Sequence, residues 1–159
     1  MPEISDLVKY AINYLSKYSS SKTNLERILK NKIRRINIEK KEKFTLYNSI
    51  PEIIKKLEKN NFINDLNYVS SKIRNFAIMG KSKMFIKSYF LKKGIEKDLI
   101  FEIFNEYDFN NPEWEIKSAK IFARKKNFIK NADDKKKNLS KMARAGFNYE
   151  TSIKILEDI

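Results

Sequence analysis

The sequence of 159 residues contains no histidine and no cysteine. These absences exclude zinc sites of the Cys/His kind and catalytic dyads of the Ser-His or Cys-His kind. They also exclude a disulfide framework. Acid–base chemistry would fall to carboxylates, lysine or tyrosine, and no pair of carboxylates stands in a suggestive arrangement. We therefore expect a protein that is not an enzyme, with no catalytic residues, no metal site and no cofactor.

Glycine, proline and long apolar runs are also scarce. Three glycines and three prolines are too few for a sandwich or barrel with many tight turns. No apolar run approaches the ~18 residues of a membrane span, and MPEISDLVKY at the N-terminus lacks the regions of a secretory signal. We expect an all-α chain of one domain or one row of repeats, monomeric and cytoplasmic, with no membrane partner.

Acidic residues are few compared with basic ones, and the formal net charge is +14. Such a surplus attracts polyanions, including nucleic acid and acidic protein surfaces. No acid lies between Asp65 and Glu96. Three basic segments contain Arg27, Lys30, Lys32, Arg34 and Arg35; Lys72, Arg74, Lys81, Lys83, Lys87, Lys92 and Lys93; and Lys117, Lys120, Arg124, Lys125, Lys126 and Lys130. They suggest one binding surface or groove. The alternative is a lysine-rich composition, typical of an AT-rich genome, whose lysines only solvate helix faces.

Apolar residues recur at helical spacing along nearly the whole chain. Thr23-Asn-Leu-Glu26 and Ser49-Ile-Pro-Glu52 match the capping-box pattern. Asn64-Asp65 and Asn111-Pro112 mark two further helix starts. These signals predict helices over residues 5–18, 22–42, 50–60, 65–79, 82–93, 96–107, 112–129, 133–145 and 149–158.

Gly94 and Gly146 each follow a helix whose last turn is cationic, and each precedes an apolar residue, as in a left-handed C-terminal cap. After the first glycine, Ile95, Asp98, Phe101 and Phe104 match Phe147, Glu150, Ile153 and Leu156 after the second. The N-terminal third has Lys32 where the glycine would stand, so its second helix is expected to continue to about residue 42. The pattern predicts tandem three-helix repeats over residues 1–62, 63–110 and 111–159.

The stretch MGKSKMFI contains Gly80-Lys81-Ser82, which matches the end of a phosphate-binding Walker A loop. That loop needs an earlier glycine, in G-x-x-x-x-G-K-[ST], and a preceding strand. The earlier position is Asn75, and KIRNFAI before Gly80 does not have the pattern of a buried strand. We interpret Gly80 as the end of one helix and Ser82 as the cap of the next.

YLSKYSSSKTNLERILKNKIRR, in the N-terminal third of the chain, resembles the opening of the RecX family of recombinase regulators. LEKNNFINDLNYVSSKIRNFAIMGKSKMFIKSYFLKKGI resembles its middle block, and AKIFARKKN with NLSKMARAGFNYETSIKIL resembles its last unit. The resemblance spans about Tyr10 to Leu156. Asn61 stands where the family usually has glycine, and Asn64-Asp65 replaces paired acids; asparagine tolerates both places because it adopts left-handed backbone and caps helices.

The resemblance implies an all-α array of tandem three-helix repeats, curved, elongated and a single layer thick. It implies a regulatory protein without catalytic residues that binds the RecA recombinase and lies in the groove of its nucleoprotein filament. Members of the family suppress ATP hydrolysis, strand exchange and repressor cleavage by RecA, so the implied setting is DNA repair and the SOS response.

On this interpretation the basic stretches contact the RecA filament. A curved basic array can contact several adjacent protomers, and its many weak contacts together give useful avidity. The candidate residues are Arg27, Arg34, Arg35, Lys72, Arg74, Lys81, Lys83, Lys87, Arg124, Lys125 and Lys126. For each one taken singly, a solvated helix face remains the alternative. Core packing is expected for Tyr14, Tyr68, Phe76, Phe90 and Phe147. Trp114 fits either the core or an interface.

A second hypothesis is direct nucleic-acid binding, single- or double-stranded, through a helix–turn–helix with residues 82–93 as the recognition helix. This helix offers lysines, Ser88 and Tyr89, not the Arg, Asn or Gln side chains that pair bidentately with bases. The expected binding is therefore weak, independent of sequence and steeply salt-dependent. A third hypothesis, an enzyme, rests only on Gly80-Lys81-Ser82.

Overall fold

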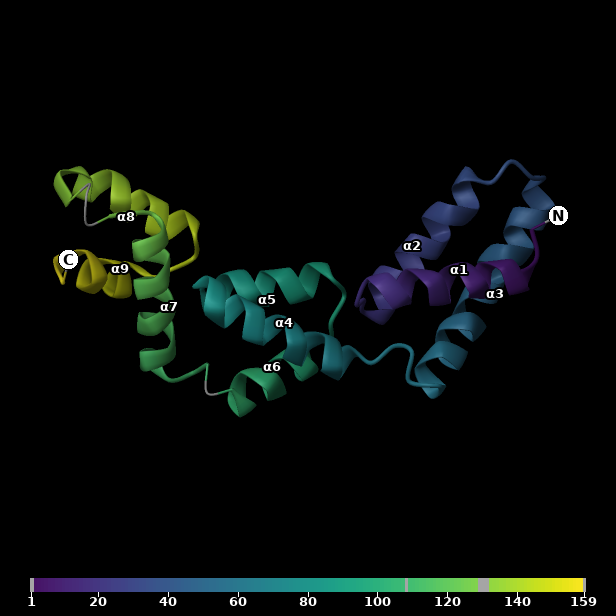
Figure 1. Ribbon diagram of the computed structural model, residues 1–159, viewed down its shortest axis with the longest axis horizontal. Coiled ribbons are helices and arrows are strands. Elements are labelled where there is room, and N and C mark those ends of the chain that lie inside the picture. Colours follow the sequence, from purple (N-terminus) through teal and green to yellow (C-terminus); the bar gives the residue numbers. More distant parts are fainter. Residues whose placement is uncertain (1, 108, 129–131, 159) are drawn as a thin grey trace. The chain divides into compact units, whose positions relative to one another are not determined.

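The computed structural model describes residues 2–107, 109–128 and 132–158, and this part of the chain contains helices and no strand (Figure 1). The helices are α1 (Ile4–Lys17), α2 (Lys22–Arg35), α3 (Lys40–Lys59), α4 (Asp65–Met79), α5 (Lys83–Lys92), α6 (Lys97–Glu106), α7 (Pro112–Lys125), the 3-10 turn η1 (Ala132–Asp134), α8 (Lys135–Arg144) and α9 (Tyr149–Glu157). The all-α prediction is confirmed. Position 129 of the predicted helix 112–129, and Lys130 of the third basic segment, lie outside the described residues.

The chain forms two compact units. The first extends to Tyr68 and also includes Lys93–Ile95, whereas the second contains Val69–Lys92 and the chain from Glu96 onward. Neither unit follows the predicted repeat boundaries after residues 62 and 110. The division into three repeats therefore stays a prediction.

The core of the first unit joins α1, α2 and α3. One face of α2 buries Leu25, Leu29 and Ile33, at the spacing of an amphipathic helix. The facing stripe of α3 contributes four buried aliphatic side chains, Leu46, Ile50, Ile53 and Leu57. Helix α1 lies across both and adds Leu7 and Ala11 (Figure 1). This core holds α2 so that its other face is exposed to solvent.

The prediction that the second helix continues to residue 42 was wrong, because α2 ends at Arg35 without a glycine. Ile36 is extended, and its N–H donates to the Ile33 carbonyl at 3.2 Å. Lys43 Nζ donates to the Arg34 carbonyl at 2.9 Å. The half-buried Ile38 packs on the core from the break itself. Lys43 therefore donates to a carbonyl at the end of α2, and Ile38 anchors the chain just after the helix. No left-handed cap is needed.

The predicted start of the third helix at residue 50 was also wrong. Helix α3 begins at Lys40, after a capping box between Glu39 and Glu42, and Pro51 lies inside it. An interior proline costs about 3 kcal/mol. The continuous buried stripe across Pro51 offsets this cost, since each fully buried aliphatic side chain contributes about 1.5–3 kcal/mol. Ser49 is not a cap; its hydroxyl donates to the Leu46 carbonyl.

The second unit buries aromatic side chains between α4 and α5 and then a smaller core under α7, α8 and α9. Phe76 of α4 contacts the rings of Phe85, Tyr89 and Phe90, with centroids 4.9–6.1 Å apart. The later core contains Ala119, Ala123, Phe128, Met142, Phe147 and Ile155. The packing predicted for Phe76, Phe90 and Phe147 is confirmed, as each is at most 7% exposed.

Three glycines end helices with left-handed backbone, a conformation that the sequence predicts for Gly94 and Gly146. Gly80, Gly94 and Gly146 have φ of 71°, 75° and 93°. The apolar residue after each of the last two, Ile95 and Phe147, is buried. Asn61 takes the same conformation, with φ of 58°, in the place where the RecX family usually has glycine. Asparagine therefore serves at this turn because it tolerates positive φ better than other non-glycine residues.

Candidate interaction surface

The Gly80-Lys81-Ser82 stretch forms a turn between two helices and connects them to a later part of the chain. Ser82 Oγ accepts the Phe85 N–H at 3.1 Å and donates to the Ala145 carbonyl at 2.7 Å. The side chain is fully buried, so both capacities of the hydroxyl are used inside the protein. The predicted cap at Ser82 is confirmed. Because helix α4 and not a strand precedes Gly80, the stretch lacks the framework of a phosphate-binding loop.

Helix α7 packs directly on this turn. The Ser118 hydroxyl donates to the Lys81 carbonyl, and Lys125 Nζ donates to the Met79 carbonyl at 3.2 Å. A Cβ on Gly80 would lie 2.9 Å from the backbone nitrogen of Phe122, which shows how closely the two segments approach. The predicted start of α7 is correct, since Asn111 Oδ1 accepts the Glu113 N–H and Pro112 is the first helical residue.

A buried acid lies where α7 meets the start of α5. Glu115 is 9% exposed, and burial raises the pKa of its carboxyl group above the ordinary value of 4.5. The positive charge and the backbone N–H of Lys83 act in the opposite direction and favour the carboxylate. The acid therefore positions α7 against the first turn of α5, where the unpaired N–H groups of a helix favour a negative charge.

We call the contact of α7 with the turn at Gly80, Lys81 and Ser82 and with the start of α5 a joint. Four of the predicted cationic residues of the second unit lie on the segments that meet there. Lys81 and Lys83 flank Ser82, while Lys125 and Lys126 end the helix that packs on the same turn. The Lys81 ammonium lies 4.5 Å from the centroid of the Phe85 ring, a cation–π distance. These contacts leave Lys81 and Lys83 partly buried, whereas Lys125 and Lys126 are exposed.

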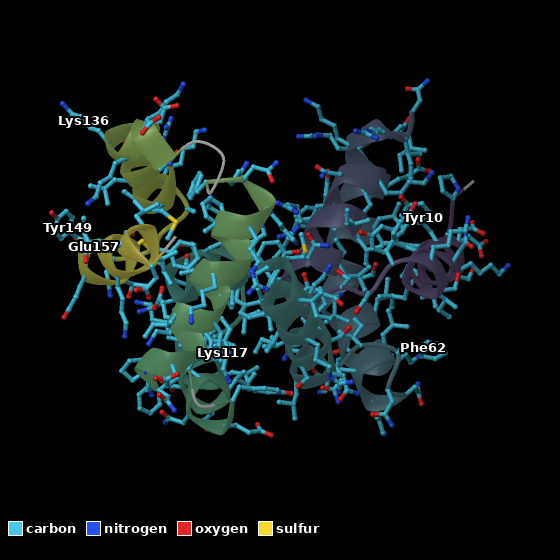
Figure 2. All side chains as sticks on the ribbon, turned by 60° about the vertical axis from the view of Figure 1, so that its left-hand side comes forward. Tyr10, Phe62, Lys117, Lys136, Tyr149 and Glu157 are labelled. Carbon is cyan, nitrogen blue, oxygen red and sulfur yellow. The ribbon has the colours of Figure 1, made fainter. Side chains whose placement is uncertain are left out.

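The remaining candidates of the second unit lie further along the same helices. Arg74 and Lys87 are exposed on α4 and α5, and Lys72 is half-buried. Arg124 shares an exposed face of α7 with Lys117 and Lys120, at spacings of three, four and seven residues. Figure 2 labels Lys117 on α7 and shows Lys136 extending away from α8. The face containing Lys117 and Lys120 was not among the predicted site residues, although its helical spacing is readable in the sequence.

Arg27, Arg34 and Arg35 belong to the first unit, whereas the other eight candidates belong to the second. All three are exposed on α2, away from its buried stripe. Arg27 Nη2 donates to Asn24 Oδ1 at 2.6 Å. That all three basic segments form one surface stays a prediction, as does the role of each residue in binding.

The first unit contains a joint of the same design, which sequence reasoning missed. Ser21, not Thr23, caps α2: its Oγ accepts the Asn24 N–H at 3.2 Å and donates to the Lys93 carbonyl at 2.7 Å. Asp65 Oδ1 accepts the Lys22 N–H at 2.9 Å. The predicted capping box at Thr23 was wrong. Comparison of the Ser21-Lys22 and Ser82-Lys83 pairs in the sequence is the signal that points to the correct cap.

The described surface offers cations and aromatic rings. Within residues 2–107, 109–128 and 132–158, no group of three or more carboxylates is arranged to hold a metal ion. None of the helices in these ranges is long and apolar enough to cross a membrane. The features that stand out chemically are positive charge and hydrogen-bonded joints between helices.

Comparison with known proteins gives sequence relatives but no matching family model. The chain is 25% identical over 155 residues to the regulatory protein RecX of Myxococcus xanthus (strain DK1622), covering 92% of this chain and 82% of the relative. It is 30% identical over 111 residues to RecX of Streptococcus agalactiae (serotype III, strain NEM316), covering 69% of this chain. The match spans 43% of the length of that second relative.

Solved structures agree with these relatives. The crystal structure of RecX from Lactobacillus salivarius superposes with a TM-score of 0.68 at 26% identity, covering 98% of this chain and 95% of that chain. A second crystal structure, of regulatory protein RecX, has a TM-score of 0.67 at 21% identity, covering 98% of this chain and 74% of that chain, and supports the fold alone. Relatives and structures lead to the same assignment: this chain belongs to the RecX family.

Proposed function

We propose that this chain is a regulator that binds RecA nucleoprotein filaments and inhibits the ATPase, recombinase and coprotease activities of RecA. Its relatives are named regulatory proteins, and the resemblance in sequence implies RecA as the partner. The observation that carries the proposal is the joint at Gly80, where α7, which ends at Lys125 and is followed by Lys126, packs on the turn that contains Lys81 and precedes Lys83 of α5. No chemical step is assigned to the chain itself.

Positive charge on several helices suits a target that repeats. A filament presents many copies of the same protein around a polyanion, so contacts that are weak singly add through effective concentration. Exposed ion pairs contribute about 0–1 kcal/mol each, and the account therefore needs several of them. A chain bound in this way inhibits by occupying space that the incoming duplex or the repressor needs.

The test is the ATPase activity of the cognate RecA, stimulated by single-stranded DNA, with this chain added below stoichiometry. We expect inhibition of hydrolysis at less than one chain per RecA protomer, because one bound chain contacts more than one protomer. Unchanged hydrolysis at all ratios, together with no co-sedimentation of the chain with filaments, contradicts the proposal.

The second candidate function is direct, sequence-independent DNA binding. The observation that favours it is the acid-free run between Asp65 and Glu96, which supplies exposed Arg74, Lys87 and Lys92 from α4 and α5. An electrophoretic shift assay separates the two functions. Shifts of any DNA sequence by the chain alone, lost steeply as the salt rises to about 200 mM, favour direct binding to phosphates.

A further inference from the structure

A groove between α5 and α6 in the second unit has no part in the joints described above. Its volume is about 590 Å³, within the range of roughly 300–1,000 Å³ that is usual for ligand sites. Its lining residues are Lys87, Leu91, Lys97, Asp98, Ile100, Phe101, Phe104 and Asn110. Four of these eight are large apolar side chains, and they come from both helices.

The apolar wall of the groove is exposed to solvent. Phe101 is 67% exposed and Leu91 38%, above Ile100, which is 3% exposed. Single exposed apolar side chains are ordinary, but several that line one concave site indicate a contact surface. Phe101 also follows Lys97 by one helical turn, so an ammonium group and the ring lie on the same side of α6.

The charges on the groove are uneven. Lys87 stands on the α5 side and Lys97 on the α6 side, with Asp98 as the one acid among the lining residues. In the part of the chain that the structure describes, neither ammonium group takes part in an ion pair within 4.0 Å. Helix α5 contains no acid at all. Two unpaired cations beside an apolar wall match carboxylates placed next to large apolar side chains.

We propose that this groove docks an amphipathic segment of the partner protein, with large apolar side chains that cover Phe101 and neighbouring Asp or Glu residues that meet Lys87 and Lys97. The inference rests on the proposed function, in which that partner is RecA in its filament. A helical segment fits best, since recognition by strand addition needs a free sheet edge and the described residues contain no strand. Nucleic acid fits less well, because Asp98 repels phosphate groups and half of the lining is apolar.

The probe is a short labelled peptide with Leu at positions i, i+3, i+4 and i+7 and Glu on the flanking positions. A twin peptide has Lys in place of every Glu. We expect the Glu peptide to bind at least about tenfold more tightly than the Lys twin, measured by fluorescence anisotropy. Lys97→Glu is expected to remove most of this difference.

Phe101→Ser removes the apolar wall, and Phe44→Ser is its matched control. Phe44 is also 67% exposed, but it lies on α3 of the first unit, outside the groove. We expect Phe101→Ser to weaken binding of the Glu peptide by about tenfold and to weaken co-sedimentation with RecA filaments, while Phe44→Ser changes neither. Circular dichroism confirms that both variants fold.

Four results overturn the inference. The first three are equal binding of the two peptides, full affinity in Phe101→Ser, and filament binding that does not change in Phe101→Ser. The fourth is oligo(dT) binding that depends on Phe101, because the groove would then serve base stacking. If the wild-type chain does not bind filaments while the peptide results hold, the proposed function fails but the chemistry assigned to the groove stands.

Discussion

The starts of α2 and α5 are built in the same way, and the comparison shows how local signals connect distant segments. Ser21 and Ser82 each accept an N–H of their own helix and donate to the carbonyl that precedes a left-handed glycine. In both cases the backbone N–H of the lysine after the serine donates to a carboxylate. Lys22 donates to Asp65, and Lys83 donates to Glu115. One hydroxyl therefore caps a helix and holds a later turn in place.

The two joints differ in burial. Asp65 is half-buried, whereas Glu115 is buried and the pKa of its carboxyl group is raised by burial. A Cβ on Gly94 would meet the side chain of Thr23, but one on Gly146 would meet Ser82 itself. The carboxylate of the second joint is thus more deeply buried than that of the first, whereas the two cap serines are equally buried.

The largest predicted effect concerns the glycines that end helices. Gly80→Ala places a methyl group against the backbone of Phe122, which cannot rotate away, and we expect a loss of about 3 kcal/mol or more in the free energy of unfolding. Gly94→Ala places a methyl group directly against Cβ of Thr23, which is fixed to the backbone of α2, so we expect a loss at least as large. Urea denaturation measures both. A loss below about 1 kcal/mol in either variant would contradict the packing argument, because left-handed backbone alone costs alanine about that much.

The cap serines test whether the joints are equivalent. Each Ser→Ala change removes a cap, worth about 1 kcal/mol. It also leaves a partly buried carbonyl without its donor, for a total near 2 kcal/mol. We expect Ser21→Ala and Ser82→Ala to agree within about 1 kcal/mol in denaturant midpoints converted to free energy. Ser140→Ala, on an exposed hydroxyl, is the control and is expected to have little effect. If the two changes lower the free energy of unfolding by clearly different amounts, then the same hydrogen-bond geometry does not give the two caps the same stability.

Charge reversal compares the two units in binding. We expect the double variant Arg124→Glu, Lys126→Glu to need about tenfold more chain to inhibit the RecA ATPase in low salt. The reason is that the second unit contains most of the candidate cations. Arg27→Glu with Arg35→Glu, equally exposed on α2, is expected to have a smaller effect. The reverse order would assign the main contact to the first unit.

The smallest effect concerns pH. Since burial raises the pKa of Glu115 above 4.5, the folded chain binds this proton more tightly than the unfolded chain does. The wild-type free energy of unfolding should therefore rise, relative to Glu115→Gln, as the pH falls from neutral towards 4.5. Glutamine can still accept the Lys83 N–H. A relative loss of stability over the same range, measured by denaturation at each pH, would contradict this sign.

Features that depend on one local residue type were predictable from the sequence. Gly80, Asn111 and Ser82 act through their own backbone or the next turn, and each was identified correctly. The break after Arg35 and the continuation of α3 through Pro51 were not, because both depend on packing against distant residues. Likewise, Ser21 and Thr23 are both acceptable caps locally, and only contacts with Lys93 and Gly94 decide between them.

For the candidate surface, the basic residues and their clusters along the sequence could be predicted. Which clusters lie next to one another in the folded chain could not. Helical spacing alone shows that Lys83 and Lys87 share a side of α5. That Lys125 reaches the Met79 carbonyl depends on the approach of α7 to Gly80, across 46 positions of sequence. The groove at Phe101 was missed for the same reason, since its two walls come from different helices.

The most direct test of the central claim is co-sedimentation of the wild-type chain with RecA filaments assembled on single-stranded DNA, over a range of salt concentrations. The account predicts that the chain pellets with filaments in low salt, and does so more than with the same DNA alone. It also predicts that raising the salt weakens the association without abolishing it at once, because apolar contacts contribute as well as charge. A chain that stays in the supernatant with filaments at low salt, or that pellets equally with bare DNA, contradicts the account.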